Sequence, residues 1–271
     1  MKNPQSYYSD TGSKARVWRD MISQDILKCG FGVDRLSRLS QIERQHFWFV
    51  GRRALINRPL TNHLEDNHQL ILDLGCGTGL MVEILMSQGY NVVGLDLRPE
   101  GLYATRQALP RSWLLQAEAI RLPLKENVFD TVMLLDVLEH VDDQALLAEV
   151  QRILRPGGLV VITVPAMPWL WSYRDDAAGH LRRYTRQQLS RTLTNARLQV
   201  QETRYYQCLL FPHFVVTRLL GRRGPGLCDL EERPLPFFNA VMTWINRLEA
   251  KLSSMICWPG GSSIVAVCRK I

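Results

Sequence analysis

The sequence lacks several features that would assign it to a particular class of protein. It has no run of about 18 uninterrupted apolar residues, so we expect no transmembrane helix. Its first 20 residues are polar and contain no apolar stretch typical of a signal peptide. The six cysteines form no C-x-x-C pair, and internal repeats and low-complexity tracts are absent. These absences predict a cytoplasmic protein with reduced thiols.

The charge balance is basic but modest. The chain of 271 residues has a formal net charge of +7, with arginine pairs at Arg52–Arg53, Arg182–Arg183 and Arg222–Arg223. Such pairs favour an anionic partner such as nucleic acid, anionic lipid or a phosphorylated substrate, and a solvated surface explains them equally well. No motif typical of RNA- or DNA-binding domains accompanies them, so nucleic acid is the less favoured partner.

Short apolar runs bounded by turn residues alternate with amphipathic segments from Leu70 onward. Two of the segments between them, Leu80–Gln88 and Asp142–Leu154, have helical spacing. Buried strands that alternate with helices favour a parallel sheet with right-handed crossovers. The sequence therefore predicts an α/β fold with a doubly wound, mostly parallel sheet. The expected strands are Leu70–Leu74, Asn91–Leu95, Trp113–Gln116, Thr131–Leu135, Leu159–Val164, Leu198–Arg204 and Ser263–Arg269.

The remaining segments suggest additions to this core. Residues 41–60 predict a helix that ends at Pro59, within an N-terminal helical extension over residues 1–66. Residues 67–204 then form the core. Residues 205–262 hold two apolar-rich segments and are too long for a hairpin, so we expect an inserted helical cap. Residues 263–271 supply the final strand of the core.

The strongest functional signal lies where the first core strand ends. Asp73 is followed by Gly75, Gly77 and Gly79, and a helix begins directly afterwards. Glycines allow a tight turn and a close approach of a ligand to the main chain, and the helix start offers unpaired N–H groups. The next strand ends in Asp96, whose carboxylate can accept both hydroxyls of a ribose. The dinucleotide fingerprint requires a glycine where this chain has Leu80, which disfavours a nicotinamide or flavin cofactor.

The pattern D-x-G-x-G-x-G followed by an acid resembles the S-adenosylmethionine-binding motif of class I methyltransferases. Three later segments, 117–124, 129–140 and 154–158, are similar in the same order to that family's loops and strand motifs. The resemblance implies S-adenosylmethionine as cofactor and a seven-stranded sheet whose final strand is antiparallel. Two further segments also resemble bacterial type 11/12 methyltransferases: residues 45–49, which contain HFWF, and residues 179–185.

The resemblance also implies roles for individual residues. The methionine half of the cofactor would lie along the glycine-rich turn, Asp96 and the adjoining Leu97 would border its ribose, and Glu118 would face the adenine amino group. Asp136 would lie beside the sulfonium. Trp48 or Phe49 could form a lid, or could simply pack the helix on the sheet. The implied cofactor-binding set is Asp73, Gly75, Cys76, Gly77, Gly79, Asp96, Leu97, Glu118, Ala119 and Asp136.

An oxygen or nitrogen acceptor can require a base, and the candidates are Asp136, His140 and His180. A packed polar residue at a helix start is the alternative for His140. The D-x-x-E-H arrangement over 136–140 resembles the E-x-x-E-H metal cluster of small-RNA 2′-O-methyltransferases and ubiquinone-biosynthesis O-methyltransferases. Aspartate replaces the first glutamate, and the spacing fixes no companion histidine. We therefore assign no metal ligands, and a divalent metal stays open.

The acceptor is the least determined part of the function. Apolar residues at helical spacing within 205–262, with Arg247 and Lys251 nearby, suggest a cap for a small-molecule or lipid-like acceptor. They also allow a peripheral contact with the inner membrane, whereas an ordinary helical pair or a homodimer face is the alternative. An RNA methyltransferase and a non-catalytic S-adenosylmethionine-binding regulator remain competing functions. The sequence does not determine the oligomeric state.

Overall fold

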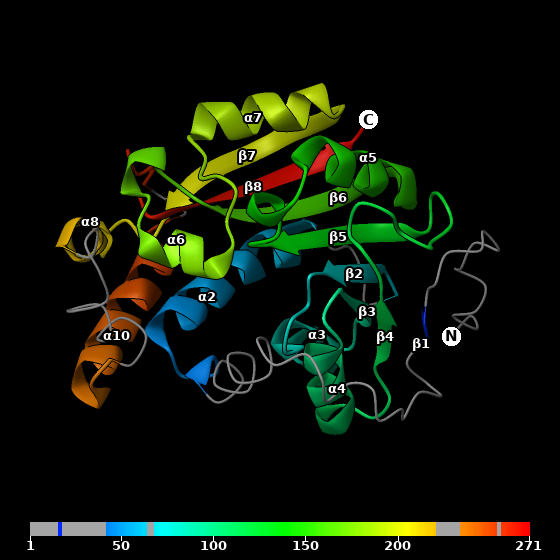
Figure 1. Ribbon diagram of the computed structural model, residues 1–271, viewed down its shortest axis with the longest axis horizontal. Coiled ribbons are helices and arrows are strands. Elements are labelled where there is room, and N and C mark those ends of the chain that lie inside the picture. Colours follow the sequence, from blue (N-terminus) through cyan, green and yellow to red (C-terminus); the bar gives the residue numbers. More distant parts are fainter. Residues whose placement is uncertain (1–15, 18–41, 64–67, 221–233, 254–255) are drawn as a thin grey trace.

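The computed structural model describes residues 16–17, 42–63, 68–220, 234–253 and 256–271 (Figure 1). Most of the predicted N-terminal extension lies outside the described residues, as do Arg222–Arg223 and part of the predicted cap. Within the described part, helices cover both faces of one central sheet. This arrangement confirms the predicted α/β class.

The sheet has the predicted seven strands, and a two-residue strand extends one edge. The order across it is β1-β4-β3-β2-β5-β6-β8-β7. Strands β2 to β6 run parallel to one another, and β8 runs antiparallel to both β6 and β7, as expected for the final strand. The chain moves outward in opposite directions from β2 and β5, whose carboxyl ends therefore form a topological switch point, where ligands bind in open α/β sheets. The bounds are β1 Arg16–Val17, β2 Leu70–Leu74, β3 Asn91–Asp96, β4 Trp113–Gln116, β5 Phe129–Leu135, β6 Leu154–Pro165, β7 Leu198–Tyr206 and β8 Ser263–Lys270.

Two apolar clusters, one on each face of the sheet, form the core. Ile56, Leu85 and Leu102 from α2, α3 and α4 belong to one cluster, and Leu147 and Leu193 from α5 and α7 belong to the other. All five side chains are fully buried, so burial of apolar area holds the helices on the sheet. The helices are α2 Phe47–His63, α3 Leu80–Ser87, α4 Pro99–Ala108, α5 Asp143–Ile153, α6 Tyr173–Ala178, α7 Arg186–Asn195, α8 Phe211–Leu220 and α10 Pro236–Leu252.

The prediction that a helix ends at Pro59 is wrong, because α2 continues to His63. A proline in a helix removes one backbone hydrogen bond. Burial of the neighbouring Ile56 and Leu60, both almost inaccessible to solvent, outweighs this local cost. Similarly, α5 ends at Ile153 instead of at the following glycines, because Leu154 is already extended and pairs with β5.

The N-terminal helix and the insertion lie side by side, although they are far apart in the sequence (Figure 1). The Nδ2 atom of Asn246 in α10 donates to the carbonyl of Phe47 over 2.8 Å, and the backbone N–H of Phe47 donates to Asn239 over 2.8 Å. Phe47 also packs with Phe214 of α8. The predicted division into extension and cap stays a prediction, but the two segments form one contiguous structure. No described helix has the length and apolar composition to cross a membrane.

Candidate functional site

The turn between β2 and α3 contains three glycines with left-handed backbone. The φ angles are 81° at Gly75, 54° at Gly77 and 75° at Gly79. A β-carbon at Gly75 would lie 2.4 Å from Val137, and one at Gly79 would lie 2.2 Å from Thr105. A β-carbon at Gly77 would meet nothing within 4 Å. The first and third glycines are therefore required by packing within the protein, whereas Gly77 presents bare backbone to open space.

Asp96 at the end of β3 binds this turn. Its two carboxylate oxygens accept the backbone N–H groups of Gly77 and Arg98, each over 2.8 Å. Burial raises the pKa of Asp96, and the two N–H groups oppose that rise. A carboxylate fixed in this way keeps lone pairs for further donors. Sequence reasoning missed Gly101 in α4, where a β-carbon would lie 2.2 Å from the carbonyl oxygen of Gly77.

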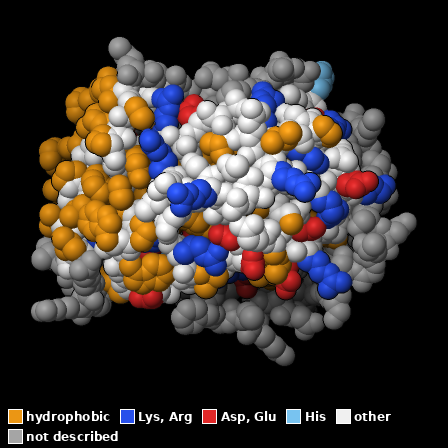
Figure 2. Space-filling view, turned by 90° about the horizontal axis from the view of Figure 1, so that it is seen from above, with side chains coloured by type: hydrophobic (Ala, Val, Ile, Leu, Met, Phe, Trp, Pro, Cys, Tyr) orange, Lys and Arg blue, Asp and Glu red, His pale blue; other side chains and the backbone are white. Residues whose placement is uncertain are grey.

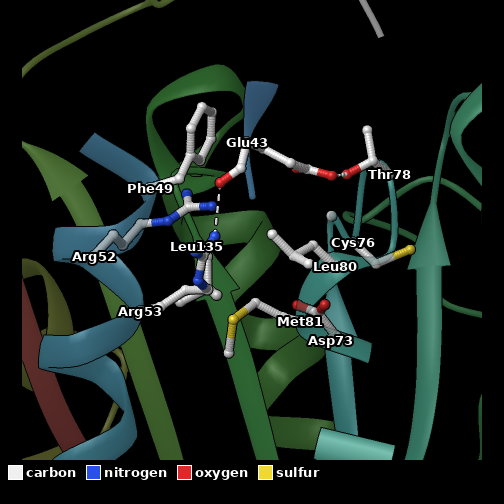
Figure 3. A pocket seen from close by; sticks show the side chains of 11 residues that line it. Glu43, Phe49, Arg52, Arg53, Asp73, Cys76, Thr78, Leu80, Met81 and Leu135 are labelled. Atoms are coloured by element: carbon white, nitrogen blue, oxygen red, sulfur yellow. Dashed lines mark hydrogen bonds between the residues drawn. The ribbon is translucent and has the colours of Figure 1, made fainter. Parts of the chain in front are cut away.

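A pocket of about 360 Å³, including its open mouth, lies between the turn and α2 (Figure 3). Asp73 and Thr78 line one side, and Phe49 and Arg52 line the other. The carboxylate of Glu43, just before α2, accepts a hydrogen bond from the Thr78 hydroxyl across the gap. The N-terminal segment therefore forms a wall of this pocket, a position that the sequence did not reveal for Glu43 or Arg52.

Arg52 connects α2 to the carboxylates at the switch point. Its guanidinium donates to Asp136 over 2.5 Å and lies 5.3 Å from the ring centroid of Phe49. Asp136 has a φ of 59° and also accepts the Thr163 hydroxyl over 3.1 Å. Desolvation raises the pKa of the buried Asp73 to about 7, the Arg52 charge opposes the rise, and the charge of Asp96 adds to it. The pocket is thus lined by two carboxylates, Glu43 and Asp73, and two arginines, Arg52 and Arg53.

The two candidate histidines come together at the same edge of the sheet. The ring centroids of His140 and His180 lie 4.8 Å apart. Burial lowers the pKa of His140, and His180 lowers it further. His180 hydrogen bonds through Nδ1 to Asp175 over 2.9 Å. Asp175 is fully buried, and sequence reasoning missed it because its pairing partners are distant in the chain.

Neither member of the Arg182–Arg183 pair is simply solvated. Arg183 is buried, donates to Asp175 over 2.8 Å, and donates to the carbonyl of Ala166 over 2.7 Å. Arg182 forms an ion pair with Asp143 over 3.0 Å. Arg183 therefore holds the loop that carries His180, and the expectation that it is either a solvated or an anion-binding residue is wrong.

Of the other predicted cofactor residues, Cys76 lines the pocket, whereas Leu97, Glu118 and Ala119 are not among its lining residues. Leu97 beside Asp96 is 58% exposed, and Glu118 is exposed on the loop after β4. Ala119 is half-buried and packs against the core. Cys76 is buried and its thiol pKa is raised by desolvation, so the thiol is a packing group. The roles of these residues toward a cofactor stay predictions.

Comparison with known proteins agrees with this geometry. Residues 72–162 match a family described as methyltransferase domain. This segment contains the glycine-rich turn, Asp96 and His140. The chain contains a class I methyltransferase domain. The predicted resemblance is thereby confirmed for this segment, and S-adenosylmethionine is the cofactor of this domain class.

Two relatives of the methyltransferase domain indicate how far the sequence similarity extends. An uncharacterized methyltransferase of Mycobacterium tuberculosis is 37% identical over 112 residues, which cover 41% of this chain and 43% of that protein. A demethylmenaquinone methyltransferase of Lactiplantibacillus plantarum is 30% identical over 159 residues, which cover 52% and 64%. The chain thus spans about half to two thirds of the length of these curated relatives.

The fold likeness covers more of the chain. A structure of the complex between the Haloferax volcanii Trm112 methyltransferase activator and a methyltransferase matches with a TM-score of 0.59 and 17% identity. The match covers 86% of this chain and 93% of that chain. At this identity the likeness shows the fold alone, and it includes strands beyond the matched family segment.

Proposed function

We propose that the protein transfers a methyl group from S-adenosylmethionine to a small-molecule or lipid-linked acceptor. One observation supports S-adenosylmethionine as the methyl donor. At the switch point of the sheet, the carboxylate of Asp96 is held by two backbone N–H groups beside Gly77, whose bare backbone faces open space. This arrangement suits a ligand that has a ribose diol and an extended chain that must lie close to the backbone.

The residues of the pocket fit the charges of S-adenosylmethionine. The buried carboxylate of Asp73 would accept the ammonium group, because a cation there offsets the desolvation that raises the pKa of Asp73. Arg52 would attract the cofactor carboxylate, and Asp96 would accept the ribose hydroxyls. When bound, S-adenosylmethionine supplies a methyl group on a positively charged sulfur, and an acceptor atom can displace that sulfur.

The chain itself would mainly align the acceptor and exclude water. The wall formed by Glu43 and Phe49 closes the pocket on the side of α2. Asp136 lies between this pocket and the histidine pair, since it contacts Arg52 and its charge, like the carbonyl of Gly179, opposes the burial that lowers the pKa of His140. His140 or His180 would take a proton from an oxygen or nitrogen acceptor.

The proposal of an apolar acceptor rests on the orientation of α10, which turns most of its apolar side chains to solvent. In α10, Asn246 and Glu249 point inward and are buried. Met242 is also buried, but most aromatic and aliphatic side chains of the same helix point to solvent, with Phe237 78% and Trp244 64% exposed. Figure 2 shows hydrophobic side chains gathered at the end of the molecule that carries α8 and α10. The exposed apolar residues there are Val216, Leu219, Leu235, Phe237, Phe238, Val241, Trp244 and Leu248.

This outward-facing stripe is the opposite of an ordinary surface helix, which turns its apolar face to the core. Specific bonds hold the buried Glu249 in place, since its Oε2 atom accepts the backbone N–H groups of Cys208 and Leu209 over 2.8 and 2.9 Å. The orientation of α10 is therefore fixed. The exposed Arg247 and Lys251 on the same helix add positive charge, which favours the surface of an anionic bilayer and a lipid-linked acceptor.

Calorimetry with S-adenosylmethionine tests the cofactor site. We expect one molecule to bind per chain, and Asp96→Ala to weaken binding because it removes the ribose acceptor and the anchor of the turn. Asp142→Ala is the control, since it removes an N-cap carboxylate outside the pocket. The absence of binding at millimolar cofactor to the folded wild-type protein would exclude the proposed function.

Vesicle flotation tests the acceptor surface. We expect the wild-type protein to float with vesicles that contain anionic lipid, and Phe237→Ser with Trp244→Ser to remain in the soluble fraction with unchanged S-adenosylmethionine affinity. Both positions are largely exposed, so the double variant should keep its fold. Recovery of the wild-type protein entirely free of vesicles would contradict the membrane contact and leave the cofactor site unaffected. A methyl-transfer screen of lipid extracts with labelled cofactor then identifies the acceptor class.

A further inference from the structure

Three side chains converge outside the lining of the cofactor pocket. Glu139 and His140 belong to a single 3-10 turn, η3 (Leu138–His140), which follows β5, and His180 follows α6. One potential ligand atom from each of the three lies within 4.8 Å of the others. The two segments are held together, because the N–H of Leu181 donates to the carbonyl of Glu139 over 2.8 Å. The cluster is thus part of the fixed structure.

Glu139 is the unusual member of this cluster. Its side chain is fully buried, and neither carboxylate oxygen has a hydrogen-bond partner. A buried carboxylate without a partner is costly. It therefore requires either a bound proton or a cation placed next to it.

Both histidines are oriented by their Nδ1 atoms. The Nδ1 atom of His180 bonds to the carboxylate of Asp175 over 2.9 Å, and Nδ1 of His140 faces the carbonyl oxygen of Gly179 at 3.3 Å. An Nδ1 atom that donates to an oxygen leaves Nε2 with its lone pair. Metal-binding histidines characteristically donate their other ring N–H to a carboxylate or a backbone carbonyl. Both partners of that kind are present here.

We infer that Glu139, His140 and His180 bind a divalent first-row transition-metal ion. Two imidazoles and one carboxylate suit zinc, iron, cobalt or nickel, whereas magnesium and calcium prefer more oxygen ligands. Three protein ligands leave coordination positions open for water or an acceptor oxygen. Asp136 is not a ligand, because Arg52 and Thr163 occupy its carboxylate. The site differs from the sequence-based expectation, which assigned no metal ligands, and it does not depend on the proposed methyl transfer.

Titration of the tag-free, chelator-treated full chain with Co²⁺ tests this site, with visible absorption as the readout. We expect one equivalent to bind, with bands from nitrogen and oxygen ligands and without a sulfur charge-transfer band. Zn²⁺ should displace Co²⁺ stoichiometrically, and a large excess of Mg²⁺ should not. Binding through sulfur, or no binding at all, would overturn the inference in favour of a protonated Glu139.

Variants locate the metal and separate ligands from supporting groups. Glu139→Gln and His180→Ala should each weaken Co²⁺ binding by at least about tenfold, since even outer-shell partners contribute about 10–100-fold to metal affinity. Asp175→Asn, which alters the group that orients His180 and removes no proposed ligand, should weaken it by about 10–100-fold. His213→Ala on α8 should bind like the wild type. Circular dichroism confirms that each variant is folded, and unchanged binding in folded Glu139→Gln and His180→Ala would refute the assignment.

Discussion

Replacement of Asp73 by asparagine tests how the pocket uses a buried carboxylate. Desolvation raises the pKa of Asp73 from 3.8 to about 7 in the folded protein. Because the folded-state pKa is the higher one, this group stabilises the fold fully at low pH, and the contribution is lost as the pH rises through about 7. Asparagine has nearly the same shape and no charge to desolvate. The variant should therefore lack this pH dependence.

The size of the effect follows from proton linkage. Between pH 6 and pH 8 the folded protein loses most of one proton that the unfolded chain has already lost, and one pKa unit corresponds to about 1.4 kcal/mol. The free energy of unfolding of the wild type should thus fall by about 1 kcal/mol more than that of Asp73→Asn over this range. Urea unfolding at both pH values measures the difference, and the control Asp176→Asn, which removes an exposed carboxylate, should keep the wild-type slope.

The affinity for S-adenosylmethionine should rise with pH, whereas the stability of the cofactor-free protein falls. An ammonium group beside Asp73 favours the ionised carboxylate, so the affinity of the wild type for S-adenosylmethionine should rise about fivefold between pH 6 and pH 7. Asp73→Asn should bind weakly at both pH values, although its apoprotein is the more stable one at pH 8. The role assigned to Asp73 would be refuted if the free energy of unfolding had the same pH dependence in wild type and variant and if both bound the cofactor with equal affinity.

Three further predictions concern residues around the turn. Gly77→Ala should cost about 1–2 kcal/mol of stability from its left-handed backbone and weaken cofactor binding measured by calorimetry, because the new methyl group occupies the open space. Gly101→Ala should lower both the melting temperature and the cofactor affinity, since its β-carbon would lie 2.2 Å from the Gly77 carbonyl oxygen. Arg52→Met should lower the free energy of unfolding by about 3 kcal/mol, because it leaves the carboxylate of Asp136 without its partner. A melting temperature of Arg52→Met equal to that of the wild type would contradict this reading of the ion pair.

The sequence alone located the strands of the sheet and the position of the ligand turn. Each core strand is a short apolar run, and local periodicity is sufficient to recognise such runs. The three glycines and Asp96 are close in sequence and lie at strand ends, so their meeting follows from the parallel topology. Only the structure shows that Gly75 and Gly79 are required by neighbouring protein atoms, whereas Gly77 faces open space.

Tertiary structure alone decided the surroundings of that turn. Arg52 and Asp136 are 84 positions apart, and Asn246 and Phe47 are 199 apart, so no local pattern indicates that these pairs meet. The outward orientation of the apolar stripe of α10 likewise depends on which partner satisfies the buried polar side chains. Periodicity predicts that a helix has an apolar face, but the direction of that face is set by the packing of segments that are distant in the chain.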